Sequence, residues 1–291
     1  MVSVIIPTRN RSIILKRAIA SVLNQTFTDL ECLVVNDCSD DDTLKLLSSI
    51  PDPRVRVFNH TMSKGASASR NLGLQNSSGD YITFLDDDDE WLPSKLEKQV
   101  SLFNSLSPDW GLIYNWMDHY LSNNILANQT HPIFEGEIFI PMLDGNIIAG
   151  TSTLMIRREV YLDLGGFDEN LSWGDDYEFS LRISRKYKIK VIKEVLTKIF
   201  NDPGYPGISA RSFQGIMDNI SGIKYILKKY QADYSGHRYE KGHMLAKVAV
   251  LYAKIKSIRG LSEYTLKAFL TDPFHYGKFR KILRSCKYLI N

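Results

Sequence analysis

The sequence YITFLDDDDE, residues 81–90, joins a short apolar run to four consecutive aspartates. The run from Tyr81 to Leu85 is typical of a buried strand. Adjacent carboxylates repel one another, so the side chains from Asp86 to Asp89 require either a bound cation or full solvation. Hard divalent ions such as Mg²⁺ bind through one or two carboxylates together with substrate phosphates. The stretch therefore predicts a strand that ends at a divalent cation site, with a solvated acidic loop as the alternative.

Strand and helix signals alternate on both sides of this stretch through the first hundred residues. The expected strands are 3–6, 30–35, 55–58 and 81–85, and the expected helices are 13–23, 41–50, 66–74 and 93–103. Ser39 or Asp40 is the expected cap of the second helix. The alternation predicts an α/β fold in which helices cover both faces of a mostly parallel sheet. Such sheets bind ligands at the carboxyl ends of their strands.

The pattern changes after residue 108. Further strands are expected at 111–120, 151–156 and 189–200, with a helix at 175–187. From about Phe213 onward only helical signals remain, interrupted near Gly236, Gly260 and Pro273. We therefore place a boundary near residue 210, between a domain of residues 1–210 and a helical region of residues 211–291.

Three of the expected strands end in polar segments. Pro7-Thr8-Arg9-Asn10 follows the first strand, Asn36-Asp37-Cys38-Ser39-Asp40 follows the second, and the acidic run follows the fourth. Because ligands bind at this edge of a parallel sheet, these segments are the candidate site.

The chain resembles a GT-A (Rossmann-like) glycosyltransferase of the large inverting family 2. Six segments within residues 2–190 carry the resemblance in the family's order. They are Val4 to Asn10, Ser21 to Thr26, Val34 to Asp41, Gly65 with Ala68 to Asn71, Leu85 to Asp89, and Gly165 to Glu169 followed by Asp175-Asp176. Any one segment would be weak, whereas six in order are specific.

The resemblance implies roles for residues on the donor side. Asp37 matches the aspartate that hydrogen-bonds the nucleotide base, usually uracil. The other implied nucleotide contacts are Pro7, Thr8, Arg9, Asn10, Arg70, Asp86 and Asp87. Asp88 matches the carboxylate that ligates Mg²⁺ or Mn²⁺, although the redundancy of the run leaves its register open. Turn or capping roles for Thr8 and Asp37, and a surface position for Arg70, are the alternatives.

On the acceptor side, Asp176 matches the general base and Asp175 its neighbour, where the family usually has Glu-Asp. The alternative is that both only stabilise a helix N-terminus. Trp173 is expected either at the acceptor site or in the core, and His131 is expected to be structural.

The implied reaction is a single displacement at the anomeric carbon, with inversion, by an acceptor hydroxyl that Asp176 deprotonates. The Q-x-x-R-W signature of processive synthases is absent, which favours addition of one sugar per encounter. A sugar-nucleotide pyrophosphorylase would carry a glycine-rich loop after the first strand, where this chain has Thr8 to Ser12 without glycine. A catalytically inactive nucleotide-binding or scaffold module of the same fold remains the alternative.

Composition places the chain among ordinary globular proteins, with 44% hydrophobic and 24% charged residues. A net charge of +3 does not imply a polyanion partner, and no nucleic acid is expected to bind. Three cysteines without metal-type spacing favour a reduced, cytoplasmic protein. No signal peptide or membrane span is predicted, because no apolar run approaches the ~18–20 residues required.

Charge is nevertheless unevenly distributed. Residues 236–291 carry a net charge of +9, and the remainder of the chain carries −6. Aromatic and aliphatic residues alternate with the last cations, as in a basic amphipathic helix that lies on anionic lipid. A helix packed on the core with a solvated basic face would look the same. Because members of the resembled family often use lipid-linked acceptors in bacterial surface-polysaccharide synthesis, peripheral contact with the inner face of the membrane is expected.

Overall fold

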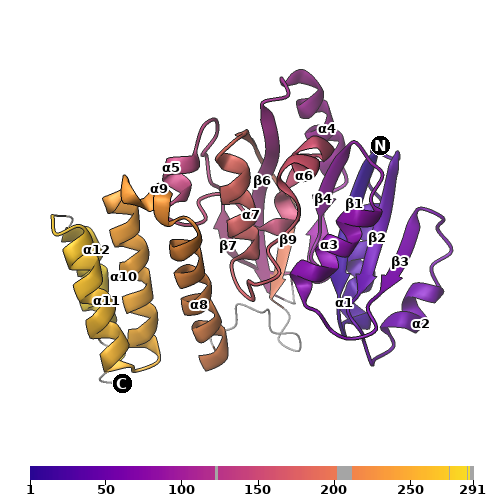
Figure 1. The fold of residues 1–291 in the computed structure, drawn as a ribbon. Coiled ribbons are helices and arrows are strands. Elements are labelled where there is room, and N and C mark those ends of the chain that lie inside the picture. The colour runs from indigo at the N-terminus through magenta and orange to yellow at the C-terminus, as the bar shows by residue number, and fades with distance from the viewer. Residues whose placement is uncertain (122–123, 202–211, 275, 287, 289–291) are drawn as a thin grey trace. The chain divides into compact units, whose positions relative to one another are not determined.

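The computed structural model describes residues 1–121, 124–201, 212–274, 276–286 and 288 (Figure 1). They fall into two compact units. The first contains the sheet and helices α1 to α4 and α6. The second contains residues 139–147, residues 170–178 and the C-terminal helices. The boundary predicted near residue 210 lies outside the described residues.

The sheet runs in the order β3-β2-β1-β4-β8-β6-β9-β5, with β7 paired to β6. Four neighbouring strands are parallel, namely β1 (Val2–Thr8), β2 (Leu30–Asn36), β3 (Val55–Asn59) and β4 (Tyr81–Phe84). The remaining strands form a mixed part, namely β5 (Glu90–Trp91), β6 (Trp110–Leu121), β7 (Leu126–Thr130), β8 (Met155–Arg157) and β9 (Lys188–Asn201). The predicted α/β class is confirmed, and the parallel part holds the four strands expected from the first hundred residues.

Both faces of the parallel strands are covered, as the uninterrupted burial of β1 and β2 requires. On one face, helices α1 (Ser12–Leu23) and α4 (Lys95–Ser105) contribute to a core that includes Val4 and Ile6. On the other face, α3 (Ala66–Asn76) approaches β1 so closely that a Cβ at Gly73 would lie 2.5 Å from Ile5 Cγ2. The shorter helices of the first unit are α2 (Thr43–Ser48) and α6 (Arg158–Leu164).

Two local predictions are wrong for the same physical reason. Residues 151–153 form a 3₁₀ turn rather than the start of a strand, and the Thr153 hydroxyl donates to the Gly150 carbonyl. The helix expected at 41–50 spans only α2, because the Asp41 carboxylate accepts the backbone N–H of Thr43 and forms a turn instead. In both places a short polar side chain offers the backbone an alternative hydrogen bond. Ser39 and Asp40 do not cap α2, which begins after Asp42.

Helices α5 (Phe139–Met142), α8 (Phe213–Lys229), α9 (Gln231–Ser235), α10 (Arg238–Lys254), α11 (Ile258–Thr271) and α12 (Tyr276–Ser285) belong to the second unit. Within that unit α10 packs against α8 on one side and against α11 and α12 on the other (Figure 1). The predicted helical C-terminal region is therefore confirmed. The interruptions expected near Gly236, Gly260 and Pro273 are also confirmed: Gly236 lies between α9 and α10, α11 begins two residues before Gly260, and Pro273 follows α11. Helix α7 (Asp175–Ser184) begins in residues of the second unit and ends in residues of the first.

Candidate nucleotide and cation site

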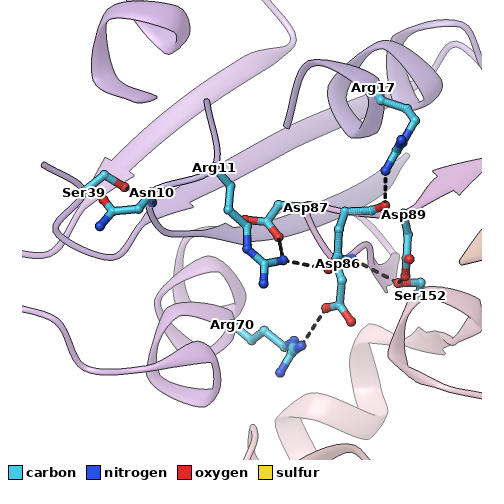
Figure 2. Close-up of polar contacts among 10 residues, drawn as sticks. Asn10, Arg11, Arg17, Ser39, Arg70, Asp86, Asp87, Asp89 and Ser152 are labelled. Atoms are coloured by element: carbon cyan, nitrogen blue, oxygen red, sulfur yellow. Dashed lines mark hydrogen bonds and ion pairs between the residues drawn. The ribbon is translucent and has the colours of Figure 1, made fainter. Parts of the chain in front are cut away.

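The loops that follow β1 and β2 are fastened to each other at the carboxyl edge of the parallel strands. Asn10 N–H donates to Ser39 Oγ at 2.9 Å, and Asp40 N–H donates to Asn10 Oδ1 at 2.9 Å. Figure 2 shows Asn10 and Ser39 side by side. Asn10 and Cys38 both have left-handed backbone angles, with φ of 55° and 57°. Non-glycine residues rarely adopt this conformation, so the two loops hold a shape that costs free energy.

Asp37 organises the segment that leads into α3. Its carboxylate accepts hydrogen bonds from Ser63 Oγ at 2.7 Å, Lys64 N–H at 2.7 Å and Gly65 N–H at 2.9 Å. Burial opposes ionisation, but the hydrogen bonds from Lys64 and Ser63 outweigh it and lower the pKa of Asp37. An ionised carboxylate has about four acceptor positions. Asp37 therefore has the turn role, since α3 begins after Gly65 without a side-chain cap, and one acceptor position remains for a donor group such as a base N–H.

The other residues after β1 are arranged around this turn. Arg9 is exposed and its Nη1 donates to Ser63 Oγ at 2.7 Å, which places a cation beside Asp37. Thr8 is buried at the end of β1. The structure thus brings the candidate nucleotide contacts of β1 and β2 together.

The acidic run alternates in exposure. The side chains of Asp86 and Asp88 are 36% and 19% exposed, whereas that of Asp87 is 8% exposed and Asp89 is buried. Asp86 and Asp88 are thus the carboxylates that a ligand can reach, which favours a register with ligand contacts at these two positions.

Arginines hold the acidic run from three directions (Figure 2). Arg11 Nη1 bridges Asp87 Oδ1 at 2.9 Å and Asp88 Oδ2 at 2.7 Å. Arg70 Nη2 contacts Asp86 Oδ1 at 2.7 Å, so the expected nucleotide contact Arg70 lies buried and orients a carboxylate. Arg17 Nη2 donates to the backbone carbonyl of Asp88 at 2.5 Å.

Ser152 hydrogen-bonds two residues of the acidic run. Its Oγ accepts from Asp86 N–H at 3.0 Å and donates to Asp89 Oδ2. Its carbonyl accepts from Trp91 Nε1 at 2.7 Å. Lys95 Nζ lies 3.8 Å from the centre of the Trp91 ring and is fully buried. The turn that carries Asp88 is therefore fixed to a buried polar network.

Burial and mutual repulsion oppose ionisation of these carboxylates in spite of the arginines. Burial raises the pKa of Asp87 to about 6, against the opposing effect of Arg11. Burial, and then the charge of Asp86, raises the pKa of Asp88. Burial also raises the pKa of Asp89 well above its usual range, with further repulsion from Asp88. A divalent cation would relieve this repulsion, and the oxygen donors suit Mg²⁺ or Mn²⁺.

Asp86 and Asp88 each engage an arginine through only one carboxylate oxygen. Among the described residues no group of three or more acidic, histidine or cysteine side chains forms a complete protein cage for a metal. The two exposed carboxylates of Asp86 and Asp88 suit an ion that takes its other ligands from substrate phosphates and water, as Mg²⁺ commonly does.

Asn71, in the family-like helix start, is wholly engaged in structure. Its Nδ2 donates to the Phe167 carbonyl at 2.9 Å and to Glu169 Oε1 at 2.8 Å, and its Oδ1 accepts from Phe167 N–H at 2.7 Å. A Cβ at Gly166 would overlap the Asn71 amide oxygen. The Gly165 to Glu169 segment is thus locked onto α3.

Asp175 and Asp176 lie in the second unit, in the first turn of α7. Both are half-buried, and Asp176 Oδ2 lies 3.5 Å from Asn146 Nδ2. Trp173 packs on α8, where a Cβ at Gly222 would lie 2.5 Å from the Trp173 carbonyl oxygen. Glu178, one turn after Asp175, is buried and paired with Tyr230 at 2.8 Å and Lys229 at 2.9 Å. This pairing holds the start of α7 against α8.

His131 has a structural role, as expected, because its ring stacks on Trp116 and its Nε2 lies 2.8 Å from Asp118 Oδ1.

The sequence analysis missed three residues that hold the acidic run, namely Arg11, Arg17 and Ser152. Arg11 directly follows the first polar segment, Pro7 to Asn10. Because β1 and β4 are neighbouring parallel strands, this segment and the acidic run end at the same edge of the sheet, and that proximity was a usable signal for Arg11. Ser152 had none, since it is more than sixty residues from the aspartates it contacts.

The sequence matches the model of the glycosyl transferase family 2 over residues 3–165. It is 38% identical over 192 residues to the Escherichia coli UDP-Glc:α-D-GlcNAc-diphosphoundecaprenol β-1,3-glucosyltransferase, covering 66% of this chain and 73% of that protein. It is 44% identical over 105 residues to the Campylobacter jejuni GalNAc(5)-diNAcBac-PP-undecaprenol β-1,3-glucosyltransferase, covering 35% and 34% of the two chains.

The alignments span 62%, 34% and 32% of the length of three other curated relatives, which are uncharacterized glycosyltransferases. The fold is similar to that of residues 1–349 of Staphylococcus aureus TarS in complex with UDP-GlcNAc. The TM-score is 0.69 with 17% identity, covering 99% of this chain and 90% of that one. The expected GT-A fold is therefore confirmed.

Proposed function

The chain belongs to glycosyl transferase family 2, and we propose that it moves a sugar from a UDP-sugar to a hydroxyl of a lipid-linked saccharide. Such a reaction would serve bacterial surface-polysaccharide or glycolipid synthesis. The named activities of the E. coli and C. jejuni relatives support an undecaprenol-linked acceptor. The donor in the E. coli relative's name and the UDP-GlcNAc complex of TarS support a uridine nucleotide.

One observation carries the donor half of the proposal. Asp37 retains an acceptor position at the same sheet edge where Asp86 and Asp88 expose carboxylate oxygens. A base N–H and a metal-bound diphosphate are the two ends of a nucleoside diphosphate. This edge therefore has a suitable group for each end of the donor.

The metal requirement is part of the proposal. Asp88, with Asp86 beside it, would hold Mg²⁺ or Mn²⁺. The bound ion would neutralise charge on the leaving diphosphate. Arg11 bridges Asp87 and Asp88 and so fixes the positions of their carboxylates. Because Arg11 lies beside the proposed metal ligand, it would also contact a phosphate of the bound donor. An inactive scaffold would have no need for a cluster of carboxylates whose ionisation is opposed by burial and by mutual repulsion.

Asp176 is the proposed general base. It would accept the proton of the acceptor hydroxyl while that oxygen attacks the anomeric carbon and UDP departs from the opposite face, which inverts the configuration. Its Oδ1 accepts a hydrogen bond from Tyr177 N–H at 2.7 Å, and the oxygen proposed for proton transfer is Oδ2. Asn146, at 3.5 Å, lies beside that oxygen and would orient it.

The test measures UDP release from UDP-glucose or UDP-GlcNAc, with and without a short-chain GlcNAc-diphosphate lipid, in Mn²⁺ or EDTA. We expect acceptor-dependent release that EDTA abolishes. Asp88→Asn should lose UDP affinity in calorimetry, whereas the exposed control Asp109→Asn should not. Asp176→Asn should keep UDP affinity while kcat and kcat/KM fall together by about 10²-fold or more.

Distinct results would contradict each part. Absence of acceptor-dependent release with every donor and acceptor tried would favour the inactive module. Equal UDP affinity in EDTA and Mn²⁺ would exclude a metal-bridged diphosphate. A dead Asp175→Asn beside a nearly active Asp176→Asn would transfer the base role to Asp175.

A further inference from the structure

Helix α11 carries an exposed apolar stripe in its last two turns and a further exposed apolar residue at its start. Ile258, Leu266, Phe269 and Leu270 are 68%, 57%, 50% and 66% exposed. Their spacing places all four on one side of the helix, opposite Leu261, Tyr264 and Ala268, which are buried. A soluble helix would normally carry polar residues at these positions, so the stripe marks an interaction surface.

The stripe continues beyond the helix. Phe274, in the turn that follows α11, is 91% exposed, and Leu283 of α12 is 66% exposed. A groove of about 410 Å³ runs between the two helices and is lined by Leu261, Leu266, Phe269, Phe279, Ile282 and Leu283. We call the set Ile258, Leu266, Phe269, Leu270, Phe274 and Leu283 the apolar face.

The apolar face differs from the one that the sequence pattern indicated. The pattern pointed to the aromatic and aliphatic residues of α12, but Ile282 is only 4% exposed and Phe279 packs against Phe269, with ring centres 5.8 Å apart. These two residues therefore hold α12 on the helix bundle. The side chains available for a partner lie mainly on α11 and in the turn after it.

Exposed cations accompany the apolar face. Arg280, Lys281 and Arg284 lie on α12, and Arg259 lies on α11 beside Ile258. The two acidic residues in this part of the chain add little negative charge to the surface. Glu263 is paired with Lys267, and Asp272 is 7% exposed. The surface therefore combines exposed aromatic and aliphatic groups with net positive charge.

We propose that the apolar face and its cations form the surface with which the protein docks on an anionic lipid bilayer. Apolar side chains would enter the boundary between headgroups and acyl chains, while the arginines and Lys281 contact lipid phosphates. A protein partner with an acidic rim would suit the same charges, but the exposed apolar side chains are spread over two helices and the turn between them, and a deformable surface accommodates such a spread better than a single anchor residue in the groove does.

The docking surface deepens the proposed function, because a lipid-linked acceptor is confined to a membrane. The binding itself requires neither donor nor acceptor. Among the described residues no helix is long and apolar enough to cross a bilayer, so contact through this surface would be peripheral and reversible.

The test is co-sedimentation of the full chain with phosphatidylcholine vesicles that contain or lack phosphatidylglycerol. The wild type should bind only the anionic vesicles, and salt should weaken the binding. Arg280→Gln with Arg284→Gln should weaken binding about 30-fold, from about fivefold for each cation near an anionic surface. Leu270→Ser with Phe274→Ser should weaken it by tenfold or more, because these side chains would leave the bilayer.

Two controls match these variants. Lys45→Gln with Lys193→Gln removes the same charge from exposed positions in the sheet unit, and Leu162→Ser removes an apolar side chain that is 70% exposed there. Neither should change binding. Because the tested side chains are exposed, their loss should leave the melting temperature unchanged.

The proposal fails if the wild type binds neutral and anionic vesicles equally or not at all, or if the matched controls lose as much affinity as the test variants. It also fails if the chain is a dimer in solution that Leu270→Ser dissociates, since the apolar face would then be a contact between two copies. The glycosyltransferase proposal is judged separately, with a short-chain acceptor in the absence of vesicles, where all four variants should keep wild-type turnover.

Discussion

Lys95 offers a prediction whose sign and size both follow from its surroundings. Its Nζ is fully buried and donates to no carboxylate among the described residues. It contacts Gln99 Oε1 at 2.8 Å, Thr83 Oγ1 at 3.3 Å and the face of Trp91. Desolvation of an ammonium costs several kcal/mol, whereas a cation–π contact returns about 2 kcal/mol. Burial therefore wins and lowers the pKa of Lys95 well below its usual value, which leaves a neutral amine in the folded state.

The neutral amine makes stability depend on pH. In the unfolded chain Lys95 binds a proton up to about pH 10.4, so below that value the unfolded state holds one more proton than the folded state. The free energy of unfolding then rises with pH by about 1.4 kcal/mol per unit. Between about pH 8 and about pH 9.5 this amounts to about 2 kcal/mol.

Lys95→Met keeps a similar volume and removes the titrating group. The measurement is urea unfolding of wild type and variant at these two pH values, followed by tryptophan fluorescence, because three of the four tryptophans lie in the sheet unit. Every other group titrates equally in both proteins, so the difference between their unfolding free energies isolates Lys95. Lys45→Met, at an exposed position, is the control and should follow the wild type. Identical pH slopes in wild type and Lys95→Met would refute the reasoning and show that the buried lysine is charged.

Two more predictions concern the site. Arg11→Met leaves Asp87 and Asp88 without their shared cation, so we expect the apo protein to lose about 3 kcal/mol of stability, or about 6–12 °C in Tm, with a larger stabilisation by Mn²⁺ than in the wild type. An unchanged Tm in calorimetry would contradict this. Gly166→Ala should cost about 1–3 kcal/mol in urea unfolding because its Cβ overlaps the Asn71 amide, and Asn71→Ala should cost less in that background than in the wild type. Strictly additive effects would show that the overlap is relieved elsewhere.

Local sequence patterns determined the strands and most helices, because burial on two faces of a parallel sheet demands short apolar runs separated by amphipathic helices. The patterns failed where short polar side chains compete for the backbone, as Asp41 and Thr153 do, and they also missed the short elements β5, β7, α5 and α6. They also indicated the candidate site, since the polar segments after β1, β2 and β4 must meet at one edge once the strands are parallel.

The tertiary structure alone decided what each polar residue does within that edge. Four aspartates are equivalent in sequence, but a turn that Ser152 and Arg17 fasten exposes Asp86 and Asp88 and buries Asp89. Arg70 and Asn71 are adjacent in the sequence of α3 and belong to the same family-like segment. Asn71 nevertheless hydrogen-bonds the distant turn at Phe167, whereas Arg70 orients the carboxylate of Asp86.

The apolar face shows the same division. The sequence indicated a C-terminal region rich in basic and apolar residues. Which of its apolar side chains stay exposed depends on how α11 and α12 pack on α10 and on each other. Secondary structure depends on neighbours in the chain, which a sequence displays directly. Charge pairing, burial and exposure depend on residues brought together from far apart, and only the folded chain specifies those.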